Sequence, residues 1–124
     1  MSDKKYTKDH EWIELEEEIA TIGITNHAQE SLGDIVFVDL PELGKTVSVG
    51  GEVSVIESVK AASDIYSPVD GEIIEVNNNL NDNVVLINQE AESKGWIFKV
   101  KILDKEQLES HMNISDYEEF LKKE

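Results

Sequence analysis

The sequence contains no cysteine among its 124 residues. This absence excludes disulfide bonds, thiolate nucleophiles and cysteine metal sites together. Any thiol or disulfide chemistry that takes place on this chain therefore has to use sulfur supplied by a cofactor.

Arginine is absent as well, so the eleven basic side chains are all lysines, and the formal net charge is −16. An acidic surface repels nucleic acid, and without arginine the chain lacks the bidentate fork that grips phosphate. We therefore expect no nucleic-acid partner. Two explanations of the charge stay open: solubility through self-repulsion, and steering toward basic protein partners.

Long apolar runs are also missing. No stretch of eighteen apolar residues occurs, which predicts that the chain does not enter a membrane. Residues 1–6 show neither the apolar core of a signal peptide nor the Arg-rich pattern of a transit peptide. We expect a cytoplasmic bacterial protein, although a processed protein of the mitochondrial matrix would look the same.

The length and the composition, with 40 % hydrophobic and 31 % charged residues, predict one soluble domain that spans residues 1–124. β-Branched and aromatic residues favour strands over most of the chain. A short acidic turn between the first two strands predicts a hairpin. The expected strands are 6–15, 19–25, 35–40 and 96–102, with further strand-type runs at 51–59 and 64–76.

Capping patterns predict short helices beside these strands. Asn26 is expected to cap and start one helix, and Gly33 is expected to end it. Asp104 is expected to cap another. A C-terminal helix at about 114–123 would begin at a capping box, Ser115 to Glu118. The expected fold is therefore mainly β, with short flanking helices and a C-terminal helix.

Motifs for catalysis by the chain itself are absent. His10-Glu11 suggests a metal ligand pair, but the second histidine of such a motif would stand at position 14, where the chain has Glu14. We therefore expect no metal site. Neither the Gly-x-Ser-x-Gly elbow of hydrolases nor a phosphate-binding loop occurs. The chain is not expected to be an enzyme.

Lys60 is the residue that the sequence singles out. It stands between two strand-type runs, and no other lysine lies between Lys45 and Lys94. The small residues that follow it would leave its amine accessible, and Glu57 and Asp64 bracket it. A free ammonium is unreactive, but acylation would remove its charge and leave an amide tether. A hairpin around 53–68 with Lys60 at its tip would suit a covalent cofactor; the alternative is an ordinary surface lysine.

The surroundings of Lys60 resemble the attachment region of the glycine cleavage system H protein family. The segments that carry the resemblance are His10-Glu11-Trp12, Ala20-Thr21-Ile22-Gly23-Ile24-Thr25, Leu32-Gly33-Asp34-Ile35-Val36-Phe37-Val38-Asp39-Leu40-Pro41, Glu57-Ser58-Val59-Lys60-Ala61-Ala62-Ser63-Asp64-Ile65-Tyr66-Ser67-Pro68, Gly71-Glu72-Ile73-Ile74-Glu75-Val76-Asn77 and Gly95-Trp96. The last helix fits as well, so the resemblance covers nearly the whole chain. Two loops depart from the family pattern: the Asn-rich segment 77–88, and residues 89–94.

This resemblance implies a flattened antiparallel β-barrel, the barrel-sandwich hybrid of lipoyl domains, with lipoic acid covalently attached to Lys60. It implies a carrier without enzymatic activity. The carrier would take an aminomethyl group from glycine decarboxylase (P-protein) to the aminomethyltransferase (T-protein), and dihydrolipoyl dehydrogenase (L-protein) would reoxidise it. A lipoate ligase or lipoyl transferase would attach the cofactor. We expect a monomer.

Three carboxylates are candidates for arm-pocket or recognition residues. They are Glu57, Asp64 and Glu11, and the latter two would give polar contacts to the amine of a loaded arm. Solvated surface carboxylates are the alternative for Glu11 and Asp64.

Other carriers fit less well. A biotinyl domain places methionine on both sides of its lysine, where this chain has Val59 and Ala61. Lipoyl domains of 2-oxoacid dehydrogenases are shorter and lack the His-Glu-Trp opening. A lipoylated relay protein that delivers lipoyl groups to other complexes is not separated from a glycine cleavage carrier by sequence.

Overall fold

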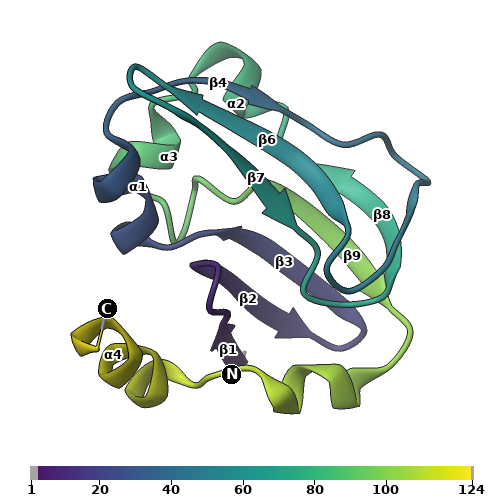
Figure 1. Cartoon of the computed structure of the whole chain (residues 1–124). Helices are drawn as coiled ribbons and strands as arrows, with labels where there is room; N and C mark the ends of the chain where they lie inside the picture. The colour runs from purple at the N-terminus through teal and green to yellow at the C-terminus, as the bar shows by residue number, and fades with distance from the viewer. Residues whose placement is uncertain (1–2, 124) are drawn as a thin grey trace.

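The computed structural model of the chain describes residues 3–123. Within these residues, nine strands form two antiparallel sheets joined by short helices (Figure 1). The strands are β1 (Asp3–Tyr6), β2 (Glu11–Glu16), β3 (Ile19–Ile24), β4 (Ile35–Asp39), β5 (Thr46–Val47), β6 (Glu52–Ser58), β7 (Ala62–Tyr66), β8 (Gly71–Val76) and β9 (Phe98–Ile102). The helices are α1 (Asn26–Leu32), α2 (Asn79–Asp82), α3 (Leu86–Gln89), the 3-10 helix Lys105–Ser110 and α4 (Ile114–Lys122).

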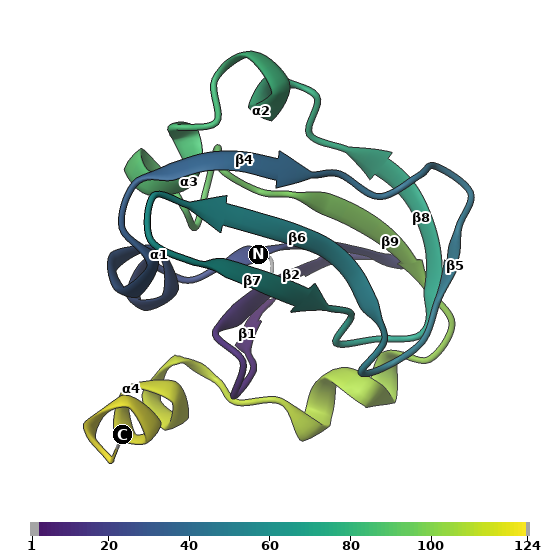
Figure 2. The same ribbon diagram turned by 45° about the horizontal axis from the view of Figure 1, so that its top comes forward.

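The two sheets lie face to face. The larger has the strand order β1-β2-β3-β9-β8-β5, and the smaller has the order β4-β6-β7. Figure 2 shows the three-stranded sheet laid across the larger one, with α1 beside the loop that joins β6 to β7. This mainly β architecture, with short helices and a C-terminal helix, is the predicted fold class. No helix among residues 3–123 is long and apolar enough to cross a membrane.

The main core fills the space between the sheets. Ile56 and Ile65 face inward from the smaller sheet, and Ile22, Phe98 and Val100 face inward from the larger one; all are buried. Burial of one such side chain stabilises the fold by about 1.5–3 kcal/mol. The alternation of strand side chains thus directs β-branched residues into one shared core.

A second cluster lies on the opposite face of the larger sheet. Trp12 directly precedes the inward-facing Ile13 on β2, and successive side chains of a strand point to opposite faces. Trp12, Tyr6 and Tyr117 are buried together, and α4 supplies Tyr117. The rings of Tyr6 and Tyr117 stack at a centroid distance of 4.8 Å. The Trp12 indole donates a hydrogen bond of 2.8 Å to the carbonyl of Ala91. We call these three residues the terminal junction, because they join the N-terminal strands to the C-terminal helix.

The caps of two helices differ from the sequence prediction. Thr25, not Asn26, caps α1, since its extended backbone lets the hydroxyl accept from the Ala28 amide. Asn113, not Ser115, caps α4, and its side chain accepts from the Asp116 amide. In both places two nearby residues have side chains that can cap a helix. The earlier residue of each pair is the one with extended backbone angles, so it forms the cap.

Of the other local predictions, some are confirmed and some are wrong. β2 and β3 pair as the expected hairpin, but Tyr6 belongs to a separate strand, β1. Gly33 ends α1 as expected. The Asn-rich segment 77–88, expected to be a loop, contains the short helix α2 and the start of α3.

Candidate functional site

Lys60 lies in the loop between β6 and β7, and the register explains its position. Glu57 pairs with Ala62, and the Ser58 amide then donates to the Ala61 carbonyl at 2.8 Å. Only Val59 and Lys60 remain to turn the chain. We call residues 58–61 the hairpin tip.

The Ser58 side chain fixes this turn. Its hydroxyl oxygen accepts from the amides of Lys60 at 3.2 Å and Ala61 at 3.1 Å. Two-residue hairpin loops usually rely on residues in the left-handed region. Among the described residues other than glycine, only His10 and Glu17 have positive φ. The serine hydroxyl therefore satisfies the amides of a loop that keeps ordinary backbone angles.

The loop after α1 supports the hairpin tip from the side. The Val59 amide donates to the Asp34 carbonyl at 3.0 Å. Asn88, from α3, holds this loop in place: its Oδ1 accepts from the Ile35 amide, and its Nδ2 donates to the Gly33 carbonyl. Part of the Asn-rich segment, which departs from the family pattern, thus reaches the support of the hairpin tip.

The side chain of Lys60 fits covalent loading. It is exposed, and in the described part of the chain no ion pair engages its amine. Its stem passes over the bare backbone of Gly33, because a Cβ at Gly33 would lie 3.3 Å from the Lys60 Cε. Gly33 has a φ of 82°, which side chains rarely adopt. An accessible primary amine on a fixed turn, with glycine beneath its stem, is what amide attachment of a long arm requires.

Glu57 and Asp64 both lie on the exposed outer face of the three-stranded sheet. Glu57 pairs with Ala62 directly below the hairpin tip, and Asp64 pairs with Val55. The charge of Asp64, followed by burial and the charge of Glu52, raises the pKa of the Tyr66 phenol. Glu57 and Asp64 thus belong to one acidic face of the sheet, on which Asp64 lies farther from Lys60 than Glu57 does.

Glu11 occupies a different environment. It is buried, with 2 % of its surface exposed, and its carboxylate accepts from the Tyr66 amide at 2.8 Å and from the Thr7 hydroxyl at 3.2 Å. Burial raises the pKa of Glu11 to about 7, against the opposing effect of the Tyr66 hydrogen bond. Tyr66 ends β7 at the far side from Lys60, about 13 Å along the strand from Ala62. The structure thus gives Glu11 a structural task that joins the two sheets.

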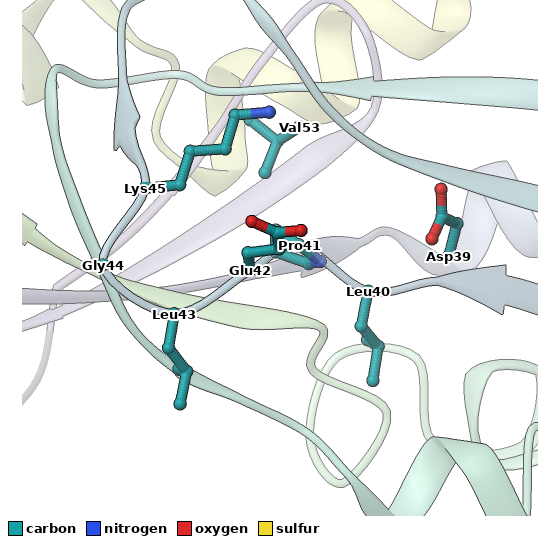
Figure 3. Close-up of a pocket in the computed structure, with 8 residues that line it drawn as sticks. All are labelled: Asp39, Leu40, Pro41, Glu42, Leu43, Gly44, Lys45 and Val53. Carbon is teal, nitrogen blue, oxygen red and sulfur yellow. The ribbon is translucent and has the colours of Figure 1, made fainter.

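Two other features lie apart from Lys60. In the described chain no group of three or more His, Asp or Glu side chains could hold a metal ion. A hollow of about 610 Å³ is lined by the loop 39–45 and by Val53, and Figure 3 shows Lys45 extending toward Val53 while Leu40 and Leu43 point away. Val53 lies at the start of β6 and Lys60 beyond its end, so this hollow is not part of the attachment site.

A barrel-sandwich of two antiparallel sheets with one accessible lysine at a hairpin tip defines the class of carrier domains that hold a covalent swinging arm. Comparison with known proteins identifies the family. The sequence profile of the glycine cleavage H-protein matches residues 4–124. Among similar proteins, the glycine cleavage system H protein of Thermotoga maritima is 52% identical over 124 residues and covers 100% of both chains. That of Escherichia coli is 56% identical over 121 residues, which are 97% of this chain and 94% of the relative.

A solved structure agrees with these sequences. The crystal structure of a glycine cleavage system H protein from Mycobacterium marinum superposes with a TM-score of 0.85 at 37% identity, over 93% of each chain. The chain belongs to the glycine cleavage H-protein family. It is a lipoyl carrier of glycine cleavage and not an enzyme, and its family holds a lipoyl group covalently on a lysine. Its role implies interaction with the other components of glycine cleavage.

Gly33 and Asn88 are the site residues whose roles the sequence did not reveal. Both act through the loop that supports the hairpin tip, and Asn88 is 53 positions from Ile35 in the chain. The single available signal was Gly33 at the end of a predicted helix, which indicated a helix stop but not a contact with Lys60.

Proposed function

We propose that Lys60 is the lysine that carries the lipoyl group. The observation that carries this proposal is an exposed amine, free of ion pairs within the described residues, on the rigid turn between β6 and β7. In attachment, the ammonium loses a proton, the amine nitrogen attacks the acyl carbon of an activated lipoyl acid, and the leaving group departs. A second proton leaves the nitrogen as the amide forms.

The chain then serves as a shuttle between enzymes. It passes an aminomethyl group from glycine decarboxylase to the tetrahydrofolate-dependent aminomethyltransferase, and dihydrolipoyl dehydrogenase reoxidises the carrier. When bound, the lipoyl group supplies the disulfide and dithiol chemistry of this cycle, which the cysteine-free chain lacks. The attaching enzyme is a lipoate ligase or lipoyl transferase. The chain works as a monomer. It acts in the bacterial cytoplasm, in keeping with the bacterial organisms of its relatives.

The residues that surround Lys60 position the arm and do not react. Ser58 and Asp34 hold the turn through the amides of Lys60, Ala61 and Val59. An arm that runs from Lys60 along β7 passes Asp64 first and reaches the region of Glu11 last. Asp64, which is exposed, is the better placed of the two to contact a charged amine on the arm. Glu57, below the turn, is a recognition residue for the attaching enzyme.

Reconstitution tests the carrier role. The lipoylated chain is added to glycine decarboxylase, and glycine-dependent exchange of labelled carbon dioxide is measured. We expect strong stimulation by the lipoylated chain and none by the unmodified chain. Absence of stimulation by a fully lipoylated chain would instead favour relay of lipoyl groups to other complexes.

A further inference from the structure

The three-stranded sheet exposes two neighbouring apolar side chains. Phe37 is 50 % exposed and Val36 is 55 % exposed. Both lie on β4, an edge strand of this sheet. The β4–β6 register shifts between Ile35 and Phe37, so two consecutive residues point away from the core. Exposed apolar residues on a sheet edge favour unwanted pairing, and natural sheets usually avoid them unless they bind something.

The register defines what surrounds Phe37. Cross-strand partners project from the same face of a sheet and lie about 5 Å apart. Two rows of such partners cross the outer face next to the hairpin tip. We call them the hairpin face, and they are Phe37, Glu57 and Ala62 in one row and Asp39, Val55 and Asp64 in the next.

The hairpin face carries three carboxylates beside the exposed ring of Phe37. Strands β4, β6 and β7 contain four carboxylates and no lysine. Lys60 is the single basic residue of the β6–β7 hairpin. The row that contains Phe37 lies immediately below the turn, within roughly 10 Å of Lys60. Such a surface is complementary to an apolar pocket bordered by lysine or arginine side chains.

Because the hairpin face lies beside Lys60, it suits some partner enzymes of a carrier better than others. An enzyme that acts on the end of a long arm can bind the carrier at a distance from Lys60. The enzyme that acylates Lys60 has no arm to use, because it must bring the amine nitrogen itself to its activated acyl carbon. That enzyme has to contact the residues beside Lys60.

We propose that the hairpin face is the docking surface for the enzyme that acylates Lys60, and that this enzyme presents an apolar pocket bordered by basic side chains. The inference rests on the proposed attachment at Lys60. It adds Phe37 as the apolar anchor and Val36 as its neighbour, with Asp39, Glu57 and Asp64 as the charged rim.

The test uses the full-length unmodified chain and a purified bacterial lipoate–protein ligase with lipoate and ATP. The rate at which Lys60 gains lipoyl mass is measured for wild type, Phe37→Thr and Phe37→Lys. Leu103→Thr is the matched control, since Leu103 is 78 % exposed and follows β9, outside the hairpin face. Melting temperatures and the reactivity of Lys60 toward a small acylating reagent are recorded for every variant.

We expect Phe37→Thr to raise KM by about tenfold with kcat little changed, as removal of an interface aromatic does. Phe37→Lys should raise KM further, because it places a charge against the basic border, and Leu103→Thr should match wild type. The small reagent should modify Lys60 equally in all variants. If Phe37→Thr lowers the melting temperature, Val36→Thr, which keeps the volume of the side chain, tests the same patch.

Other outcomes overturn the inference. Wild-type KM values for both Phe37 variants, or an equal loss in Leu103→Thr, would remove the hairpin face as the docking surface. A lipoylated Phe37→Thr chain that fails in carbon dioxide exchange, after normal lipoylation, would assign the face to a glycine cleavage enzyme instead. Absence of a lipoyl group on Lys60 of the wild type would refute the proposed attachment itself, and the inference with it.

Discussion

The hairpin tip and the terminal junction are held by different forces. The junction joins the chain ends through three buried aromatic side chains, with ring stacking and an indole hydrogen bond. The hairpin tip exposes Val59, Lys60 and Ala61. Its backbone amides are held by hydrogen bonds to the Ser58 hydroxyl and to the Asp34 carbonyl. At the junction buried side chains make the structure. At the hairpin tip, these hydrogen bonds from backbone amides make the structure, and the side chain of Lys60 stays available.

This difference explains how a carrier can be modified without being destabilised. The lysine stem passes over Gly33 and fills no part of the core, so the fold gains little from the side chain of Lys60. Substitution of Lys60 at the hairpin tip should therefore remove function with little effect on stability. Substitution at the terminal junction should lower stability with little effect on the acylation of Lys60.

The largest expected effect is on function at the hairpin tip. Lys60→Arg should abolish lipoylation and carrier activity, because a guanidinium is not acylated under these conditions. It should change the free energy of unfolding by less than about 0.5 kcal/mol, as exposed substitutions usually do. Mass spectrometry and urea denaturation measure the two quantities, with Lys45→Arg as control. Carrier activity that survives in Lys60→Arg would contradict the assignment.

The largest expected effect on stability is at the terminal junction. Tyr117→Ala should lower the free energy of unfolding by about 3–5 kcal/mol, because it removes a buried ring between α4 and Tyr6. Ile114→Ala, on the exposed side of the same helix with 48 % of Ile114 exposed, should cost less than about 1 kcal/mol. Lys60 should still be acylated in any folded Tyr117→Ala chain. Equal destabilisation by both variants would show that α4 is not anchored through Tyr117.

Glu11 should make stability depend on pH. Its folded pKa of about 7 lies above its ordinary value of 4.5, so between these values the folded state binds more protons than the unfolded state. The stability that comes from this protonation is complete below about pH 4.5 and is lost as pH rises to about 7. The loss is about 3 kcal/mol.

Glu11→Gln isolates this effect from the other carboxylates. The amide keeps an acceptor for the Tyr66 amide but does not titrate. The difference in unfolding free energy between wild type and Glu11→Gln should therefore change across pH 5 to 8, in favour of the variant at high pH. A difference that stays constant with pH would mean that Glu11 ionises normally.

The smallest expected effect is at the support of the hairpin tip. Asn88→Ala removes the partners of the Ile35 amide and of the Gly33 carbonyl, which should cost about 1–3 kcal/mol. Asn81→Ala, an exposed asparagine in the same segment, is the control and should be close to neutral. Faster hydrogen exchange at the Val59 amide in Asn88→Ala alone would locate the effect at the hairpin tip; unchanged exchange would separate Asn88 from it.

Much of this arrangement follows from local sequence. Strand periodicity predicts the β2–β3 hairpin and the strand at β9, and small residues after Lys60 indicate an accessible amine. The specific motif around Lys60 gives the family, which the comparisons confirm. These features depend on neighbours in the chain, so they can be inferred without the fold.

Contacts between distant segments could not be inferred in this way. A glutamate on a strand is usually exposed, and the burial of Glu11 becomes evident only when the Tyr66 amide lies beside it. Asn88 is one asparagine among several in its segment, and its bonds to Gly33 and Ile35 depend on how α3 packs against the end of α1. The bulge that exposes Val36 arises from the pairing of β4 with β6.

We propose that Lys60 alone carries the cofactor. The most direct test of this proposal is intact-mass analysis of the chain purified from its native cell, followed by peptide mapping of all eleven lysines. We expect one lipoyl increment, located on Lys60. A biotin increment, a lipoyl group on another lysine, or an unmodified Lys60 in cells that lipoylate other proteins would contradict it.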